Sequence, residues 1–375
     1  MKIAIDIRSA AGEKAGKGWY TFHIVQNLLK LDQKNEYILY SKDPVPGFGQ
    51  FPNAQIKGFK SPGILWHYAV ARDAKKENVD YFFAPSSYII PSLLHKSIKS
   101  IITVHDLVAF LYPNKHNKKA TILEKIFLKK ALKKSHHVLT VSNNTKDDLL
   151  QRFQGTEDKI SVVPCAADPD YRPIKKEALE KFTKQTNLPE KFFLAVGTIE
   201  PRKNYETLIK AFSNFAHHHP EYHLVIVGKE GWKFQPVYEE INKNYLNKKV
   251  HILGYLSNSS LQKLYNLATA LVFPSHYEGF GIPPLEAMQS GCPVISSSSS
   301  SMPEVVGDCA LLCKPGSVED FTSAMLEISA NPELRAQLIA KGLERAKKFS
   351  WKGSAKKVLE LMCDGQNPSL MLWFR

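Results

Sequence analysis

Two carboxylates flank a glycine-rich turn in the second half of the chain. Glu278 precedes Gly279-Phe280-Gly281, and Glu286 follows Glu278 by eight positions. The apolar run 270–273 predicts a strand before the turn, and Pro284 predicts the first turn of a helix, where its missing N–H would be unpaired anyway. Free amides at a helix start bind anions such as a diphosphate, and nearby carboxylates accept hydrogen bonds from sugar hydroxyls. The pattern favours a sugar nucleotide; a surface turn with two solvated glutamates is the alternative.

Short apolar runs alternate with amphipathic segments along the whole chain, which predicts parallel strands covered by helices on both faces. The runs fall into two sets: 3–7, 37–40, 81–84, 100–104 and 137–141, then 192–196, 224–227, 250–253, 270–273 and 293–295. We therefore expect an α/β protein with two Rossmann-like domains whose parallel sheets face each other across a cleft. In such sheets ligands bind beyond the carboxyl ends of the strands.

The domain boundaries follow from where the pattern is interrupted. We expect an acceptor-side N-terminal domain over 1–170 and a linker over 171–188, where prolines and a lysine- and glutamate-rich segment intervene. A C-terminal domain over 189–350 follows, and then a helix and tail over 351–375. The tail ends in the apolar run 370–374, for which packing against the N-terminal domain and contact with lipid are both open.

Composition and charge narrow the functional classes. The chain is 43% hydrophobic and 23% charged, as in globular proteins, and lacks the ~18-residue apolar run that spans a bilayer. Charge near the N-terminus argues against a signal peptide, so we expect a cytoplasmic protein. Five scattered cysteines without a CxxC pair indicate reduced thiols rather than disulfides or a metal site.

Much of the net charge of +14 comes from one segment. Eight lysines lie between Lys115 and Lys134, against the single acid Glu124. Within it, apolar residues recur at helical spacing and predict a basic amphipathic helix: Ile122, Ile126, Phe127 and Leu132. Such a helix suits an anionic membrane surface. A solvated lysine face over an ordinary core stripe is the alternative.

The order of motifs resembles that of the family 4 (group 1) retaining glycosyltransferases, which have the GT-B fold, and in particular bacterial mannosyltransferase-like members. The resemblance runs from Ile5-Asp6-Ile7-Arg8 to Phe349-Ser350-Trp351. Its most specific segments are Leu253-Gly254-Tyr255-Leu256, Phe273-Pro274-Ser275-His276-Tyr277-Glu278-Gly279-Phe280-Gly281, Gly291-Cys292-Pro293 and Ser301-Met302-Pro303-Glu304.

The resemblance assigns roles to the residues around the turn. Glu278 and Glu286 match a pair in which the first glutamate meets the donor sugar and the second the ribose hydroxyls. The amides of Phe280 and Gly281 would bind the diphosphate and sugar, and Lys203 would neutralise the diphosphate as a mobile point charge.

The same motifs indicate further donor-binding residues, and at one position this chain differs from the family's motif. Gly197, Leu256 and Gly279 belong to the donor-binding segments. Many relatives place an arginine after the glycine that corresponds to Gly197, whereas this chain has Thr198. We expect Arg202 to supply the missing charge.

On the N-terminal side, Gly16 and Gly18 resemble the family's glycine-rich loop at the cleft. His105 resembles a histidine near the donor sugar, and Asp106 would orient its imidazole. The string Asp168-Pro169-Asp170 tempts a metal-binding interpretation, but its place at the domain boundary favours a turn.

The resemblance implies a metal-independent hexosyltransferase without a cofactor, which retains configuration at the transferred sugar. GDP-mannose is the favoured nucleotide-sugar donor, with UDP-glucose and UDP-N-acetylglucosamine open. The acceptor would be a glycan or lipid-linked saccharide in cell-surface polysaccharide synthesis, such as that of lipopolysaccharide, at the inner face of the cytoplasmic membrane. The alternative from another class is a basic protein that binds anionic lipid or nucleic acid without transferase activity, although no nucleic-acid-binding motif is present. A phosphorylase of the same fold would need a lysine-bound pyridoxal phosphate, which we do not expect.

Overall fold

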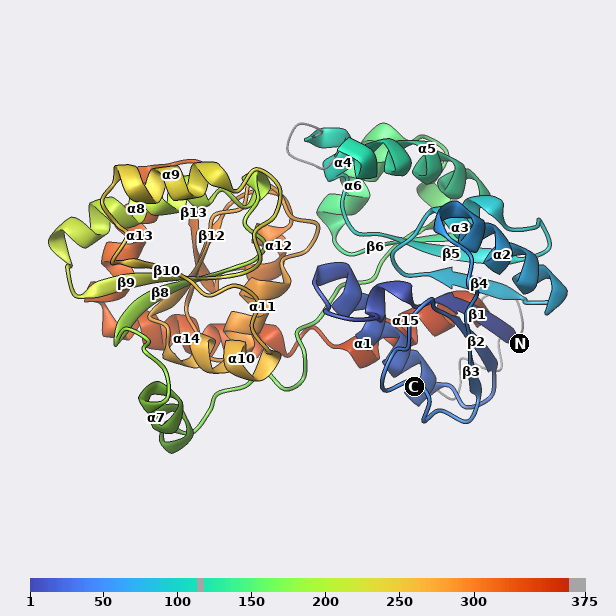
Figure 1. The fold of residues 1–375 in the computed structure, drawn as a ribbon, viewed down its shortest axis with the longest axis horizontal. Coiled ribbons are helices and arrows are strands. Elements are labelled where there is room, and N and C mark those ends of the chain that lie inside the picture. Colours follow the sequence, from blue (N-terminus) through green and yellow to red (C-terminus); the bar gives the residue numbers. More distant parts are fainter. Residues whose placement is uncertain (113–117, 364–375) are drawn as a thin grey trace. The chain divides into compact units, whose positions relative to one another are not determined.

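The computed structural model describes residues 1–112 and 118–363 (Figure 1). These residues form two compact units, the first made of 1–112, 118–165 and 350–363, and the second of Ala166–Phe349. Each unit has a parallel sheet with helices on both faces. The prediction of an α/β protein with two Rossmann-like domains is confirmed. Lys115 and the apolar run 370–374 lie outside the described residues.

The sheet of the first unit has the order β3-β2-β1-β4-β5-β6-β7 within the described residues. Every neighbouring pair is parallel, for example β1 with β2 and β4. The strands are β1 (Lys2–Asp6), β2 (Glu36–Tyr40), β3 (Ala54–Lys57), β4 (Tyr81–Ala84), β5 (Lys99–Val104), β6 (His137–Thr140) and β7 (Ile160–Val162). The central strands are buried because both faces are covered.

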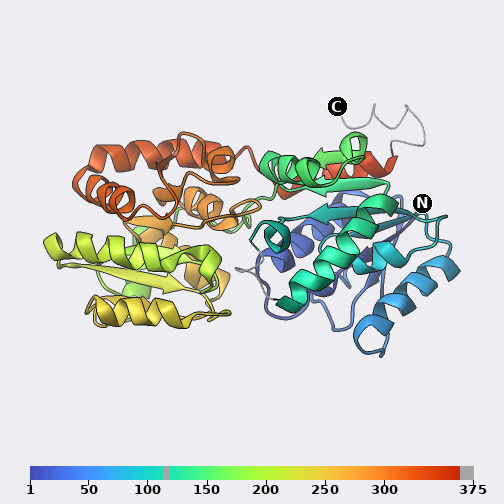
Figure 2. The same cartoon turned by 90° about the horizontal axis from the view of Figure 1, so that it is seen from above.

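Two groups of helices cover this sheet. One face packs against α2 (Gly63–Lys76), α3 (Ile89–Leu93) and α5 (Lys118–Lys134), with Trp66 and Leu128 in the shared core. Figure 2 shows α5, in blue-green, lying over the strands. On the other side α1 (Gly16–Leu31) packs against α15 (Trp351–Cys363), so the C-terminal helix lies beside an N-terminal one (Figure 1). The shorter α4 (Val108–Leu111) and α6 (Asn143–Arg152) complete the unit.

The second unit has the strand order β10-β9-β8-β11-β12-β13, again all parallel. Its strands are β8 (Lys191–Val196), β9 (Tyr222–Val227), β10 (Val250–Ile252), β11 (Ala270–Phe273), β12 (Val294–Ser297) and β13 (Ala310–Cys313). Its helices are α7 (Lys176–Lys184), α8 (Tyr205–His218), α9 (Gln235–Lys243), α10 (Asn258–Leu267), α11 (Ile282–Gln289), α12 (Met302–Val306), α13 (Val318–Ala330) and α14 (Pro332–Ala346).

Two features differ from the sequence-based expectations. The strands β3, β7 and β13 were not predicted, and each lies at the edge of its sheet. Helix α7 lies within the predicted linker 171–188, in the second unit. Among the described helices, none is both long and apolar enough to cross a bilayer.

The contact of α15 with α1 predicts the effect of removing its first side chain. Trp351 is 3% exposed, stacks on His23 at 5.3 Å between ring centroids and meets Tyr20 edge-on at 5.7 Å. We expect Trp351→Ala to lower the free energy of unfolding of the first unit by about 3–5 kcal/mol, as for other buried aromatic side chains. Urea unfolding followed by hydrogen exchange of the α1 amides measures the loss. Lys352→Ala, at an exposed neighbour, is the control; equal stability of the two variants would contradict the packing role.

Candidate functional site

A buried carboxylate joins two cations at the ends of strands β8 and β11. Glu278 lies in the loop after β11, and its Oε1 accepts a hydrogen bond from Nζ of Lys203 at 2.7 Å. Its Oε2 lies 2.7 Å from Nη1 of Arg202, whose Nη2 donates to Glu200 at 2.7 Å. Glu278 is 9% exposed and Lys203 8%. The sequence-predicted Arg202, Lys203 and Glu278 therefore form one cluster, and with Glu200 its formal charges balance.

The backbone after β8 explains how Lys203 reaches this carboxylate. Gly197 has φ 142°, and a Cβ there would lie 3.1 Å from Cε of Lys203, so the glycine leaves room for the lysine chain. The 3-10 turn Pro201–Lys203 ends at Asn204, which has φ 57°. The Asn204 side chain donates to the Pro274 carbonyl at 3.1 Å. Local backbone geometry thus fixes two strand-end loops against each other.

The electrostatics of the cluster keep it ionised. Burial opposes the charged form of Glu278, but the Arg202 and Lys203 cations outweigh burial and hold the pKa of Glu278 at about 2. Burial lowers the pKa of Lys203, and the attraction of Glu278 opposes that effect. A carboxylate with two cationic partners is a poor nucleophile but a good anchor for positive charge.

Serines after β12 hold the Glu278 loop. The backbone N–H of Glu278 donates to Oγ of Ser300 at 2.9 Å. Oγ of Ser301 donates to the carbonyls of Glu278 at 3.0 Å and Phe280 at 2.7 Å. Sequence analysis assigned no role to Ser300 and Ser301, which end the polar run 296–301. The polar run itself is the signal, since serines supply the short hydrogen-bonding side chains that a tight loop needs.

Pro284 lies in the first turn of the helix after the loop, as predicted. Helix α11 begins at Ile282, so Pro283 and Pro284 both lie in its first turn and have no N–H to offer. The available anion-binding amides are therefore those of the turn that ends at Ile282, not of the helix beyond it. Gly281 caps the helix with φ 111°, and a Cβ there would lie 2.2 Å from Cε of Met302, so only glycine fits.

Glu286 has a different environment from Glu278. It lies in the middle of α11, where Oε2 accepts a hydrogen bond from the Tyr265 hydroxyl at 2.9 Å. Burial raises the pKa of Glu286 to about 7, the Tyr265 hydrogen bond opposes this shift, and the negative charge of Asp168 adds to it. Tyr265 was not among the residues predicted for the site.

The first unit holds the other predicted residues. Gly16 and Gly18 belong to the first turn of α1 rather than to a loop, and a Cβ at Gly18 would lie 2.6 Å from the Ser9 carbonyl oxygen. His105 is buried at the end of β5, and its Nε2 donates to the Pro85 carbonyl at 2.7 Å, which fixes the tautomer. Burial and Lys17 lower the pKa of His105 to about 4, so the imidazole is neutral at pH 7. The orienting bond is thus with Pro85, and Asp106 adds an electrostatic interaction.

Two further predictions fall in the second unit. Leu256 lies half-buried between β10 and α10, beyond the carboxyl end of a strand. Asp168-Pro169-Asp170 forms a turn, as predicted: the amide of Asp170 donates to Oδ1 of Asp168 at 2.9 Å. Within the described residues, no group of three or more histidine, cysteine, aspartate or glutamate side chains is arranged to hold a metal ion.

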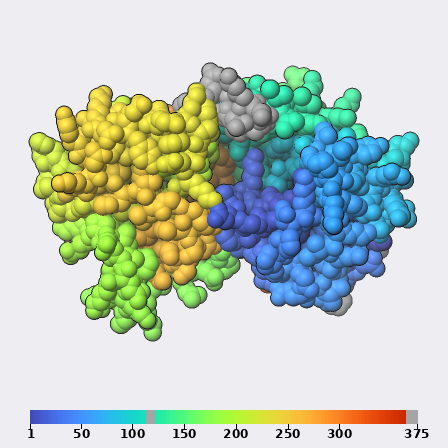
Figure 3. Space-filling view, in the orientation of Figure 1, coloured from blue at the N-terminus to red at the C-terminus, as the bar shows by residue number. Residues whose placement is uncertain are grey.

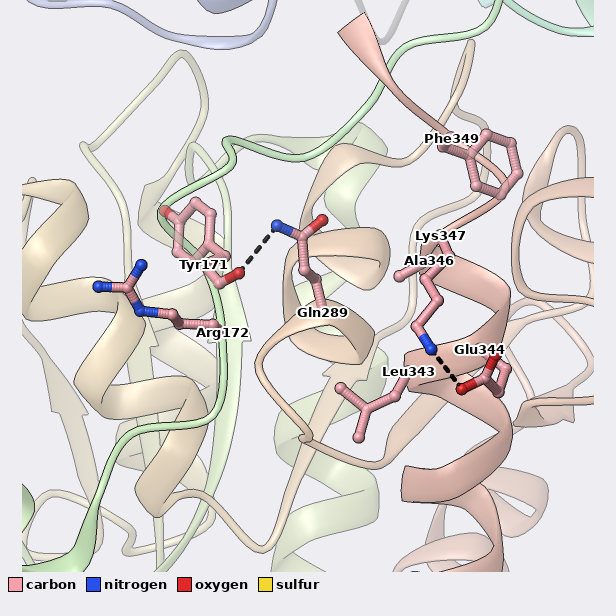
Figure 4. Close-up of a pocket in the computed structure, with 8 residues that line it drawn as sticks. All are labelled: Tyr171, Arg172, Gln289, Leu343, Glu344, Ala346, Lys347 and Phe349. Carbon is pink, nitrogen blue, oxygen red and sulfur yellow. Dashed lines mark hydrogen bonds and ion pairs between the residues drawn. The ribbon is translucent and has the colours of Figure 1, made fainter. Parts of the chain in front are cut away.

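A cavity of about 380 Å³ lies at the other end of α11 (Figure 4). Gln289 lines it and donates to the Tyr171 carbonyl at 2.8 Å. Lys347 in its wall is paired with Glu344 at 2.6 Å. These polar groups bind one another, and the cavity adds nothing to the cluster around Glu278.

Comparisons with known proteins identify related sequences. The profile described as "Glycosyl transferases group 1" matches residues 176–345, and the profile "Glycosyltransferase Family 4" matches residues 16–171. The chain is 30% identical to O-antigen chain mannosyltransferase B of Escherichia coli, over 76% of this chain and 75% of that protein. It is 34% identical to O-antigen chain mannosyltransferase RfbU of Salmonella typhimurium, over 66% of this chain and 64% of the relative, slightly less than two thirds of its length.

The fold is also similar to that of solved structures. HepE of Anabaena, solved in complex with UDP and glucose, superposes with a TM-score of 0.79 over 96% of this chain and 98% of HepE. The two sequences are 16% identical, so this likeness concerns the fold alone.

The raised pKa of Glu286 predicts a pH-dependent stability. Because its folded-state pKa of about 7 exceeds the ordinary value of 4.5, its stabilising effect is fully present below pH ~4.5 and is lost as the pH rises through ~7. We expect the wild type to lose about 1–3 kcal/mol of unfolding free energy relative to Glu286→Gln across this range. Urea unfolding of both proteins at pH 4.5 to 8 measures the difference. Curves that stay parallel would contradict the assignment; Glu177→Gln, at an exposed position, is the matched control.

Proposed function

The chain belongs to the group 1 glycosyltransferases, and we propose that it transfers a hexose from a nucleotide sugar with retention of configuration and without an obligatory metal ion. It is a hexosyltransferase of the bacterial mannosyltransferase type, with a role in polysaccharide synthesis. The observation that carries the proposal is the buried cluster of Arg202, Lys203 and Glu278 at the carboxyl ends of β8 and β11. This edge of a parallel sheet is where nucleotides bind in such folds.

The favoured donor is GDP-mannose. Two relatives with 30% and 34% identity are named as O-antigen chain mannosyltransferases, which supports mannose as the transferred sugar. HepE, of similar fold, was solved with UDP and glucose, so UDP-sugars belong in any test. The acceptor we propose is a glycan or a lipid-linked saccharide.

The cluster suggests how the donor would bind. Glu278 pairs with both cations. A donor diphosphate would compete with it for Lys203 and Arg202 and leave the carboxylate free for a sugar hydroxyl. The same cations would then stabilise the charge that develops on the leaving diphosphate, the task a divalent ion performs in other transferases. Because Glu278 would then accept a hydrogen bond from a sugar hydroxyl, we assign it to sugar positioning rather than to covalent catalysis.

The remaining donor-side residues fit the same scheme. Glu286 would accept hydrogen bonds from the ribose hydroxyls, and it does so best when ionised. Leu256 offers an apolar surface for the base beyond the carboxyl end of β10. The turn at Gly279, Phe280 and Gly281 supplies amides for the diphosphate and sugar. Arg202 takes the place of the arginine that relatives have at the position of Thr198.

A panel of GDP- and UDP-sugars tests the proposal. With chelator present, we expect the protein to bind and slowly hydrolyse one donor, GDP-mannose, with release of GDP. Product analysis by NMR reports whether the anomeric configuration is retained. Binding of no nucleotide sugar would overturn the transferase mechanism and leave a basic surface-binding protein as the better account.

Two variants separate the roles within the cluster. Glu278→Gln removes the anion that competes for Lys203 and Arg202, so we expect GDP to bind about tenfold more tightly while hydrolysis of GDP-mannose is lost. Lys203→Ala should lose both GDP binding and hydrolysis of GDP-mannose, because it removes a positive charge that binds the diphosphate. Isothermal titration with GDP provides the affinities. Equal GDP binding by wild type and Glu278→Gln would contradict the exchange of partners.

Association with an anionic membrane is a further part of the proposal. Helix α5 is present as predicted. Two of the apolar residues that recur at helical spacing are exposed rather than in the core: Ile122 is 58% and Ile126 59% exposed. They lie among exposed lysines, including Lys125 and Lys129. Residues of α5, in blue-green, contribute to the surface of the first unit in Figure 3. Apolar side chains among cations suit the inner face of a cytoplasmic membrane.

Vesicle sedimentation tests this association. We expect binding to vesicles with anionic lipid, weakened by salt, and weakened at least fivefold in the double variant Ile122→Ser, Ile126→Ser. Tyr245→Ser, at a residue that is 92% exposed in the second unit, is the control. Equal binding by both variants would assign the membrane contact elsewhere.

A further inference from the structure

A buried tyrosine fixes one of the two carboxylate oxygens of Glu286. Tyr265 lies on α10, which packs beside α11, and its hydroxyl donates to Oε2 of Glu286 at 2.9 Å. Tyr265 is 0% exposed, whereas Glu286 is half-buried. Within residues 1–112 and 118–363, no group donates to the other oxygen, Oε1, and that oxygen is not fully buried. The carboxylate therefore has one oxygen held from inside the protein and one available to a ligand.

The ring of Tyr265 is held in place by the chain segment before α7. Tyr171, which is 3% exposed, meets this ring edge-on at 5.7 Å between centroids. The Tyr171 carbonyl accepts a hydrogen bond from Nε2 of Gln289 at 2.8 Å, which is drawn in Figure 4. Gln289 follows Glu286 by three positions on α11, so the two side chains are neighbours on one face of that helix. The face of α11 that carries Glu286 thus also anchors the packing partner of Tyr265.

Amide side chains of α10 hold the same segment from the other side. They recur every four residues and so share one helix face: Asn258, Gln262 and Asn266. Nδ2 of Asn258 donates to Oδ2 of Asp168 at 3.1 Å, and Nδ2 of Asn266 donates to the Arg172 carbonyl at 3.1 Å. Gln262 donates to the Asp170 carbonyl between them. The segment is therefore fixed along α10, and Tyr171 is fixed against the Tyr265 ring.

The hydroxyl of Tyr265 contributes something that the ring does not. A phenylalanine would keep the ring contacts, and among the described residues the only hydrogen bond of the hydroxyl is the one to Glu286. This bond favours the ionised carboxylate and opposes the effect of burial, which raises the pKa of Glu286 to about 7. An ionised carboxylate in a fixed orientation is a strong acceptor of hydrogen bonds from hydroxyl groups.

We propose that Tyr265 is a positioning residue for the donor nucleotide, whose hydroxyl holds Oε2 of Glu286 so that Oε1 accepts a hydrogen bond from a ribose hydroxyl. This inference rests on the proposed transferase function, in which Glu286 binds the ribose. Tyr265 is fully buried and donates to Glu286, so it acts through that carboxylate without touching the nucleotide. Recognition of the ribose should therefore depend on a hydroxyl group that lies beneath the binding surface.

Nucleotides with and without the ribose hydroxyls test this role. The probes are GDP and 2′,3′-dideoxy-GDP, titrated calorimetrically; the corresponding uridine nucleotides serve if the donor panel selects UDP. We expect the wild type to bind GDP about tenfold more tightly than the dideoxy nucleotide. Tyr265→Phe should bind GDP about fivefold more weakly than wild type and the dideoxy nucleotide within about twofold of wild type, because the lost bond matters only where a ribose hydroxyl is present.

Two further variants separate positioning from stability. In a Glu286→Ala background, adding Tyr265→Phe should change GDP affinity by less than about twofold, because the two side chains act as one unit. Tyr37→Phe is the matched control: Tyr37 is buried in the first unit, and its hydroxyl donates to Oδ2 of Asp32 at 2.6 Å. It removes the same kind of bond, and we expect both nucleotide affinities to stay as in the wild type.

The outcomes distinguish this inference from the proposed function. If Tyr265→Phe weakens both nucleotides equally, or still prefers GDP as strongly as the wild type does, the positioning role is overturned and the transferase proposal stands. If the wild type binds both nucleotides equally, the ribose role of Glu286 fails together with this inference, while the diphosphate-binding role of Lys203 and Arg202 stands. If the wild type binds neither guanosine nor uridine diphosphate, both proposals fail.

Discussion

The pairing of one buried carboxylate with two cations is the constraint on which the donor-side structure depends. Neither Lys203 nor Glu278 would be stable at 8% and 9% exposure alone, because burying an isolated charge costs several kcal/mol. Their contact joins segments that are 75 residues apart in sequence. It explains why Gly197 leaves space for a lysine chain and why Ser301 holds the loop by two carbonyls. The charges of this cluster are thus held in place by contacts within the fold itself.

The two glutamates of the motif show how one helix and its preceding loop produce opposite acid strengths. Glu278 has cations on both oxygens and a pKa of about 2, whereas Glu286 has a tyrosine hydroxyl and a pKa of about 7. Both are sheltered from water, so the difference comes from their partners. A group that is always ionised suits the task of holding cations in place, and a group that titrates near neutrality makes the charge of α11 depend on pH.

The central strands could be predicted from sequence because burial on both faces makes them apolar throughout. Strands β1 and β8 show this pattern. The missed strands β3, β7 and β13 lie at sheet edges, where part of each strand faces solvent. Polar residues interrupt β3 and β7, whereas β13 is apolar throughout and was missed although its sequence carries the signal. The prediction that Pro284 lies in the first turn of a helix is confirmed, but two consecutive prolines fit several positions in a first turn, and only the φ of Gly281 fixes where α11 begins.

Motifs also located Arg202, Lys203 and Glu278, which contact one another in one cluster. The motifs could not show which other residues hold that cluster in place. Glu124 illustrates the physical limit. In the sequence it is the single acid in a lysine-rich helix, and the spacing of Ile122 and Ile126 appeared to define the buried face. Those isoleucines are more than half exposed, and the core lies on the side of Leu128. When a helix has apolar residues on two sides, its sequence alone does not determine which side faces the core. Tertiary packing determines this, and in α5 it places a carboxylate on the side that faces the interior.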